Sequence, residues 1–233
     1  MVSEEILGLE EVKAFYNHTE ILRGITLSVM RRESVGLMGR IGAGKTTTLK
    51  SILGLLRTSG SIKFKGKEIT RIPTFRIANM GIGYVPEGRK LYGELNVNEN
   101  LEIAMAGAHS DKEVLSIAYD LFPELKDKKF NKAKLLSGGE RQMLSIARAL
   151  VGKPELLLMD EPYEGLAVPI IRRLNQSFHE IRKGGLTIFV TWASIKGLES
   201  IADRIYIIDR GRIIFNGGVQ EGRSFASINN LIL

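Results

Sequence analysis

A glycine-rich stretch with one lysine and two threonines, residues 39–47, is the part of the chain best equipped for chemistry. It matches the phosphate-binding pattern G-x-x-x-x-G-K-[ST] with no change in spacing. Glycines let the backbone curl so that successive N–H groups point at phosphate oxygens. Lys45 can reach the β- and γ-phosphates of a nucleotide, and the Thr46 hydroxyl can ligate Mg²⁺. The residues expected to contact the nucleotide are Gly39, Arg40, Gly42, Ala43, Gly44, Lys45, Thr46 and Thr47.

Two adjacent acids, Asp160 and Glu161, follow the apolar run 156–159. Such a run is typical of a parallel strand that is buried on both faces. At the strand's carboxyl end, Asp160 can hold Mg²⁺ or a water bound to it. We expect Glu161 to point to the strand's other side, where it can orient and deprotonate an attacking water. Acid pairs are common after strands, but about 115 residues beyond a phosphate loop this pair indicates a nucleoside triphosphatase, with Glu161 and Lys45 as catalytic residues.

A third motif is the sequence Ser137-Gly138-Gly139-Glu140, which opens a helix marked by a stripe of apolar residues. A serine and two glycines at a helix N-terminus form a second anion-binding site. A single ATPase core has no use for a second phosphate site remote from the first, so the motif predicts a partner subunit whose nucleotide it contacts. The alternative is a Ser-Gly-Gly loop that caps an ordinary helix.

The elements that would position these motifs alternate between strand and helix. The buried strand 34–38 leads into the phosphate loop, and Leu49, Ile52, Leu53 and Leu56 mark the helix after it. A capping box at Ser110 and Glu113 begins a further helix. This order predicts an α/β fold, with a small antiparallel sheet beside a parallel core. The expected strands are 7–16, 25–29, 60–66, 156–159, 186–191, 205–208 and 213–215, and the expected helical segments are 91–150 and 171–181.

The composition fits a soluble globular chain of one domain. It has 233 residues, 44% of them hydrophobic and 25% charged, and no cysteine, so disulfides and thiolate metal sites are excluded. No signal peptide is expected from the acidic first residues, and the sequence has no run of about 18 apolar residues. The net charge of +7 permits an acidic partner, but the lysines are dispersed. The basic segment 126–134 lacks interleaved aromatic residues, and no nucleic acid is expected.

Taken together, the three motifs resemble those of ATP-binding cassette (ABC) proteins, and the resemblance covers nearly the whole chain. It implies a P-loop NTPase (RecA-like) core with an N-terminal antiparallel β subdomain and an inserted α-helical subdomain at about 91–150. Residues 1–233 would form one nucleotide-binding domain that takes ATP and Mg²⁺. In the family, two copies pair head-to-tail, and the segment corresponding to 137–140 contacts the partner's ATP. The second ATPase subunit could make a homodimer or a heterodimer.

The resemblance also assigns two residues outside the three motifs. Tyr16 occupies the place of the aromatic ring that stacks on adenine, although a buried core tyrosine is the alternative. Glu87 lies where most members have a glutamine that touches Mg²⁺ and the attacking water, so the resemblance implies that Glu87 is a third catalytic residue and a metal ligand.

The sequence of residues 84–89, Tyr-Val-Pro-Glu-Gly-Arg, resembles the corresponding sequence in the ATPase subunits of branched-chain amino acid importers. This resemblance implies that transmembrane permease subunits are partners of the chain and that they bind near residues 87–101. It also implies a peripheral position on the cytoplasmic face of the plasma membrane.

The chain departs from the family at two places. Members carry a histidine or glutamine where this chain has Ala193, or Trp192 after a one-residue shift, and an alanine methyl can neither donate a hydrogen bond nor relay a proton. Tyr163 and Glu164 replace small residues at the expected dimer interface. We therefore expect slow hydrolysis. The alternative functions are a hydrolysis-impaired nucleotide sensor and a soluble ABC ATPase without a role in transport.

Overall fold

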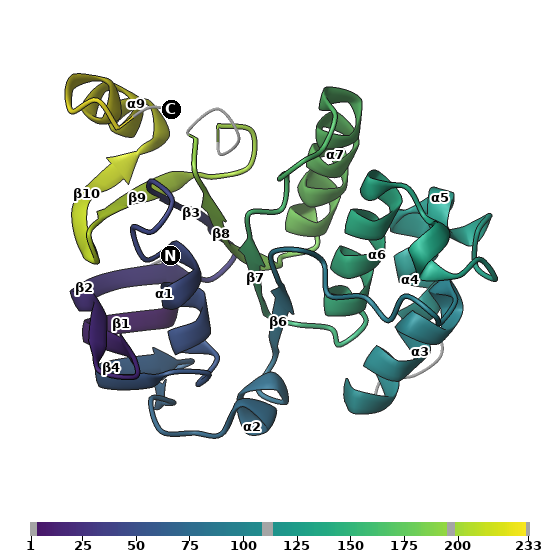
Figure 1. Ribbon diagram of the computed structural model, residues 1–233, viewed down its shortest axis with the longest axis horizontal. Helices are drawn as coiled ribbons and strands as arrows, with labels where there is room; N and C mark the ends of the chain where they lie inside the picture. The colour runs from purple at the N-terminus through teal and green to yellow at the C-terminus, as the bar shows by residue number, and fades with distance from the viewer. Residues whose placement is uncertain (1–3, 109–113, 195–198, 232–233) are drawn as a thin grey trace.

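Two β-sheets make up the framework of the protein (Figure 1). The computed structural model describes residues 4–108, 114–194 and 199–231. The first sheet is antiparallel, has the order β2-β1-β4-β5, and consists of β1 (Glu5–Tyr16), β2 (Thr19–Met30), β4 (Arg57–Phe64) and β5 (Lys67–Glu68). The second has the order β10-β9-β3-β8-β7-β6 and consists of β3 (Ser34–Met38), β6 (Ile82–Val85), β7 (Leu156–Asp160), β8 (Thr187–Trp192), β9 (Arg204–Asp209) and β10 (Arg212–Gly218).

The second sheet is parallel from β9 to β6, and only β10 runs antiparallel to its neighbour β9. This arrangement confirms the predicted α/β class and the small antiparallel sheet beside a parallel core. The parallel strands end at one edge, so the segments that follow β3, β7 and β8 are brought together there.

Helices surround the parallel sheet. Figure 1 shows a group of them beyond β6, on the side away from the antiparallel sheet, while α7 stands beside β7 and β8. The predicted helical segment contains α3 to α6 and a short 3₁₀ turn, whereas the capping box predicted at Ser110 and Glu113 lies outside the described residues. The helices are α1 (Lys45–Ile52), α2 (Thr74–Ala78), α3 (Val97–Ala108), α4 (Val114–Leu121), α5 (Pro123–Lys126), η1 (Ala133–Leu135), α6 (Gly138–Leu150), α7 (Val168–Lys183) and α9 (Val219–Ile228).

The parallel sheet separates two hydrophobic cores, because successive side chains of a strand point to opposite faces. Leu156 and Leu158 of β7 pack with α1 and the antiparallel sheet. Leu157 and Met159 pack with α6, α7 and the helices beyond β6. All four are fully buried, which is why this strand reads as a continuous apolar run.

Two details differ from the sequence-based expectation. Helix α1 ends at Ile52 and does not reach Leu56, because Gly54 adopts a left-handed conformation with φ of +66° and stops the helix. Strands β5 and β6 and helices α2 and α9 were not predicted. Among the described residues, no helix has the length and apolarity needed to cross a membrane.

Candidate functional site

The phosphate loop joins β3 to α1 and leaves a helix N-terminus without a side-chain cap. Gly44 is the N-cap residue of α1, with φ of +119°, and no side chain accepts a hydrogen bond from the first turn. Gly42 has φ of +79°, so both positions favour glycine. A Cβ at Gly39 would lie 2.4 Å from the main-chain oxygen of Ile208. The free N–H groups and the positive end of the helix dipole make this N-terminus suitable for an anion.

Lys45 is buried and folded back over its own loop. Its Nζ donates to the main-chain oxygens of Gly39 at 2.7 Å and Arg40 at 3.2 Å, and it lies 3.0 Å from Oε1 of Glu161. The ammonium group is therefore held at the centre of the loop, where a phosphate would compete with the Glu161 carboxylate for it.

Asp160 is 1% exposed at the end of β7. Its Oδ1 accepts hydrogen bonds from Thr46 at 3.1 Å and from Thr191 at 2.7 Å. Its Oδ2 is buried and has no hydrogen-bond partner among the described residues. Thr191 is a site residue that the sequence analysis missed, although it was visible as a polar side chain directly after the apolar residues 188–190.

Glu161 lies just beyond β7, and this corrects the orientation expected for it. The strand ends at Asp160, and Glu161 has a left-handed backbone with φ of +47°, so the alternation of side chains in a strand no longer applies. Its carboxylate turns toward the phosphate loop, where Oε1 pairs with Lys45 and Oε2 accepts from the main-chain N–H of Ala193 at 3.2 Å. Asp160 and Glu161 therefore both face the loop.

Burial raises the pKa of the Glu161 carboxyl above its ordinary value of 4.5, and Asp160 adds to this rise. Lys45 and the N–H of Ala193 act in the opposite direction without cancelling it. A carboxylate with a raised pKa is a better proton acceptor than an ordinary one, so Glu161 has the chemistry of a general base.

Two cavities meet at Thr46. One, of about 220 Å³, lies between Tyr16 and the phosphate loop. The other, of about 470 Å³, includes Glu87 and Asp160 in its walls. Tyr16 is 40% exposed, so it is not the core tyrosine that was the alternative. Burial and then the charges of Asp160 and Glu87 raise the pKa of Tyr84, which also lines the second cavity.

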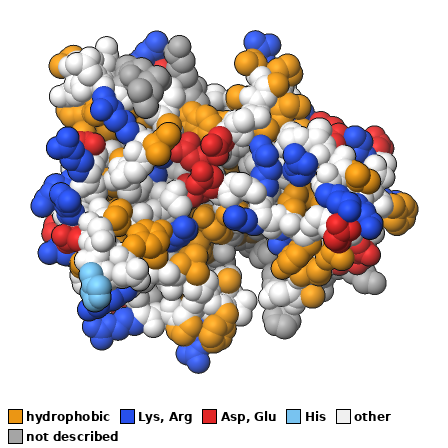
Figure 2. Space-filling view, in the orientation of Figure 1, with side chains coloured by type: hydrophobic (Ala, Val, Ile, Leu, Met, Phe, Trp, Pro, Cys, Tyr) orange, Lys and Arg blue, Asp and Glu red, His pale blue; other side chains and the backbone are white. Residues whose placement is uncertain are grey.

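Side chains of the acidic type gather over the loop between β7 and α7 in Figure 2, at the middle of the face shown. Among the described residues, no three His, Cys, Asp or Glu side chains form a metal cage. The residues nevertheless fit Mg²⁺ that arrives with a nucleotide, because a hydroxyl and a carboxylate suit this cation, and the unpaired Oδ2 of Asp160 offers it an acceptor.

Ser137 lies apart from the phosphate loop. It caps α6 in a capping box: the Glu140 N–H donates to Ser137 Oγ at 3.3 Å, and the Ser137 N–H donates to Glu140 Oε2 at 2.9 Å. Ser137 is exposed, and a Cβ added at Gly138 would meet no atom within 4 Å. Figure 1 shows strands β6 and β7 between α6 and α1. One chain therefore presents this helix N-terminus to the surroundings and not to its own phosphate loop.

The two departures from the family pattern have different surroundings. The side chain of Trp192 packs edge-on against Tyr163, with ring centroids 5.3 Å apart, whereas the main chain of Ala193 contacts Glu161. Tyr163 is only 2% exposed, and its hydroxyl donates to Asn175. The Tyr163 side chain is therefore part of the core of its own chain and is not presented to a partner. Glu164 is exposed.

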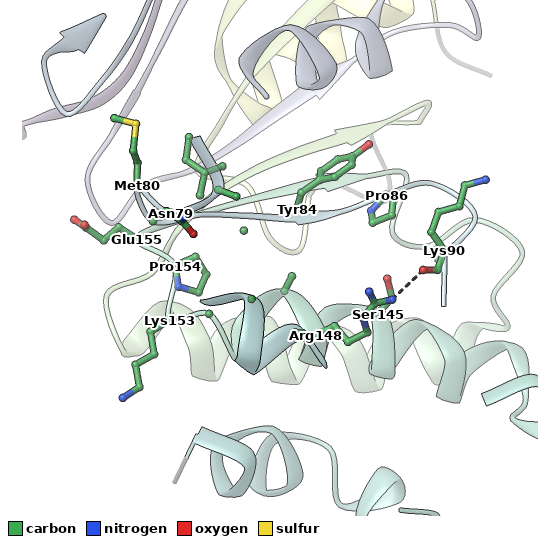
Figure 3. Close-up of a pocket in the computed structure, with 18 of the residues that line it drawn as sticks. Asn79, Met80, Tyr84, Pro86, Lys90, Ser145, Arg148, Lys153, Pro154 and Glu155 are labelled. Carbon is green, nitrogen blue, oxygen red and sulfur yellow. Dashed lines mark hydrogen bonds between the residues drawn. The ribbon is translucent and has the colours of Figure 1, made fainter. Parts of the chain in front are cut away.

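A groove of about 930 Å³ lies between β6 and α6, outside the phosphate site (Figure 3). Met80 and Glu155 lie toward one end of the view, Pro86 and Lys90 lie toward the other, and Arg148 lies between them. Arg148 donates to the main-chain oxygen of Lys90 at 2.9 Å.

Comparisons with known proteins agree on one family. The family model described as ABC transporter matches residues 22–164. The chain is 38% identical over 216 residues to the high-affinity branched-chain amino acid transport ATP-binding protein BraG of Pseudomonas aeruginosa, covering 91% of this chain and 92% of the relative. It is 33% identical over 231 residues to the lipopolysaccharide export system ATP-binding protein LptB of Haemophilus influenzae, covering 93% and 92%.

A solved structure shows the same fold. It is an ATP-binding cassette of an ABC transporter in its ADP conformation, and it superposes with a TM-score of 0.85 at 24% identity, with 98% of each chain covered.

Proposed function

Because the chain belongs to the ABC transporter family and has its ATPase fold, we propose that it is the energy-coupling subunit of an importer for branched-chain or other amino acids. Members of the family are ATP-hydrolysing P-loop enzymes. In this proposal residues 1–233 act as one nucleotide-binding domain, with the helical subdomain at about 91–150. ATP binding closes a pair of such domains and hydrolysis reopens it.

The proposal rests on four side chains that lie close together at the phosphate loop, those of Lys45, Thr46, Asp160 and Glu161. Lys45 would hold the β- and γ-phosphates, and the N–H groups of residues 39–47 would surround them. Glu161 would accept a proton from the attacking water, for which its raised pKa suits it. Tyr16, exposed beside the loop, would stack on the adenine ring.

Thr46, Asp160 and Glu87 are the residues that would hold Mg²⁺. The bound ion would neutralise charge on the phosphate oxygens. The Thr46 hydroxyl already lies 3.1 Å from Oδ1 of Asp160, so the two side chains are close enough to share one cation. Glu87 lines the same cavity from the loop after β6.

A second ATPase subunit would complete each site. The exposed N-terminus of α6, residues 137–140, would contact the γ-phosphate of ATP bound to the partner's phosphate loop. Its separation from the phosphate loop of its own chain supports this role. The partner could be a second copy or a related chain.

The groove between β6 and α6 is where we place the transmembrane permease subunits. Its volume of about 930 Å³ suits a short helix of a partner, and its lining includes Arg89 and Lys90 of the segment 87–101 that is predicted to bind the permease. Binding there would hold the chain on the cytoplasmic face of the plasma membrane.

Export is the second candidate direction of transport, since the chain also resembles the lipopolysaccharide export ATPase LptB at 33% identity. The greater identity to BraG, 38%, favours import of amino acids. Purification of the chain from membranes of its own source tests both. Co-purification of a permease with an amino-acid-binding receptor supports the proposal. Co-purification of a lipid-export complex overturns the import assignment, and a chain that binds ATP but is free of membrane subunits overturns the transport assignment.

A further inference from the structure

Arg89 joins three segments that carry different motifs. Its Nε donates to Oε1 of Gln142 at 3.1 Å, and its Nη2 donates to the main-chain oxygen of Glu164 at 3.1 Å. Arg89 is two residues beyond Glu87, Gln142 belongs to α6, and Glu164 lies in the loop after Glu161. One guanidinium thus connects the Glu87 loop, the helix that begins at Ser137 and the loop of the general base.

Helix α6 holds the backbone of Arg89 in an unfavourable conformation. Arg89 and Lys90 have φ of +66° and +43°, in the left-handed region that ordinary residues avoid. Ser145 donates to the main-chain oxygen of Arg89 at 3.1 Å, and Arg148 donates to that of Lys90 at 2.9 Å. Gln142, Ser145 and Arg148 follow one another at intervals of three, so one face of α6 holds the whole segment. Such backbone strain persists only where surrounding contacts maintain it.

Arg89 also separates two cavities. Together with Pro86 it lines both the groove of about 930 Å³ and a smaller cavity of about 260 Å³. Glu161 lines the smaller cavity. An occupant of the groove would therefore touch the same side chain that holds the loop of Glu161.

The contact with Glu164 is well placed to act on Glu161. The N–H of Glu164 donates to the main-chain oxygen of Glu161 at 3.1 Å, and the N–H of Leu166 donates to that of Tyr163 at 3.2 Å. These bonds make the loop a short connected turn. Fixing the oxygen of Glu164 therefore limits the movement of the backbone that carries the Glu161 carboxylate.

We propose that Arg89 is a positioning residue for ATP hydrolysis: it holds the loop after Glu161 against α6. The proposal rests on the proposed function, since Glu161 is taken as the general base. The planar guanidinium can donate in two directions at once, to Gln142 and to Glu164, which the single ammonium of a lysine cannot reproduce.

The test compares Arg89→Ala and Arg89→Lys with the control Arg182→Ala. Arg182 also donates to a main-chain oxygen, that of Ile201 at 3.2 Å, and to a carboxylate, that of Asp203, but it contacts none of the site residues described above. We expect Arg89→Ala to lower kcat about 10- to 100-fold while KM for ATP stays within about twofold. Arg89→Lys should recover only part of kcat, and Arg182→Ala should keep it. An unchanged kcat in Arg89→Ala, or a rise in KM alone, would overturn the proposal.

Hydrogen exchange gives a readout that does not need turnover. The amides of Glu164 and Leu166 are hydrogen-bonded within the loop, so Arg89→Ala should exchange them at least about tenfold faster than the wild-type chain, and Arg182→Ala should not. If the wild-type chain fails to hydrolyse ATP, the proposed function is wrong, and the exchange rates still decide the role of Arg89. Equal rates in Arg89→Ala and wild type would refute it.

Discussion

Lys45 Nζ lies 3.0 Å from Oε1 of Glu161, so the cation of the phosphate loop and the proposed general base neutralise each other. Both side chains are largely buried, and a buried charge needs a partner. A bound phosphate can replace the carboxylate as the partner of Lys45, which would free Glu161 to contact water. The pair thus connects nucleotide binding to the availability of the base.

Glu161→Gln should keep ATP binding and lose hydrolysis. Glutamine can still accept a hydrogen bond from Lys45, but it cannot take up a proton, and loss of a general base costs about 10²- to 10⁴-fold in rate. Single-turnover hydrolysis and equilibrium binding of ATP measure the two effects separately. The control is Glu180→Gln, on the exposed surface of α7. Equal hydrolysis by Glu161→Gln and the wild type would show that the base is another group.

The stability of the chain should depend on pH through Glu161. Its pKa is raised in the folded state, chiefly by burial, so folding favours the protonated form. The stabilisation is therefore fully present below the ordinary pKa of 4.5 and is lost as pH rises through the raised value. Relative to Glu161→Gln, the wild type should lose free energy of unfolding across this range, as measured by urea unfolding without nucleotide. If the free energies of unfolding of the wild type and Glu161→Gln change with pH in the same way, the raised pKa is contradicted.

The rate of ATP hydrolysis should rise as pH increases through the raised pKa of Glu161, because a general base must be deprotonated to act.

Thr191→Val should reduce both stability and hydrolysis. The Thr191 hydroxyl donates to Asp160 and accepts from the N–H of Glu161, and leaving buried polar partners unpaired costs about 1–3 kcal/mol. Thr187→Val is the matched control: Thr187 is a buried threonine of the same strand that accepts the N–H of Arg32 at 2.9 Å, at the opposite end from the site. Both variants should unfold at lower urea concentration, and only Thr191→Val should lose ATPase activity. Equal activity in the two variants would exclude a role for Thr191.

Ala193→His should accelerate hydrolysis. Ala193 contributes only its main-chain N–H to Glu161, and Trp192 packs into the core, so neither side chain supplies a donor to the γ-phosphate. One lost transition-state contact typically costs about 10²- to 10³-fold. Steady-state ATPase assays of both proteins test this. A wild-type rate of several turnovers per second that the substitution leaves unmoved would show that Ala193 does not slow the enzyme.

The sequence was most informative where one local pattern determines one structure. The spacing of 39–47 defined the loop, and the apolar run 156–159 defined a strand buried on both faces. Strand β6 was not predicted because its four residues are too few to show an alternation of apolar and polar side chains. The predicted helix after the phosphate loop is longer than α1 because the left-handed turn at Gly54 is a feature of backbone geometry. Local patterns indicate element types more reliably than element ends.

Contacts between distant segments could not be read from the sequence. Thr191 reaches Asp160 only because β7 and β8 pair in register, with Asp160 opposite Thr191. The burial of the Tyr163 ring beside Trp192 cannot be read from its position in the family pattern. The orientation of Glu161 depends on one left-handed residue after the strand. The roles of the site residues stay predictions until the variants are measured.

The most direct test of a site shared between two chains is the molar mass of Glu161→Gln with ATP and Mg²⁺, measured by light scattering with and without Gly138→Asp. Space around the Gly138 Cβ position is open, so aspartate should leave the fold and ATP binding intact while its charge repels the partner's γ-phosphate. The account predicts twice the 25.9 kDa chain mass for Glu161→Gln and a single chain for the double variant. A Glu161→Gln protein that binds ATP and stays at one chain mass, or a double variant that still pairs, would contradict it.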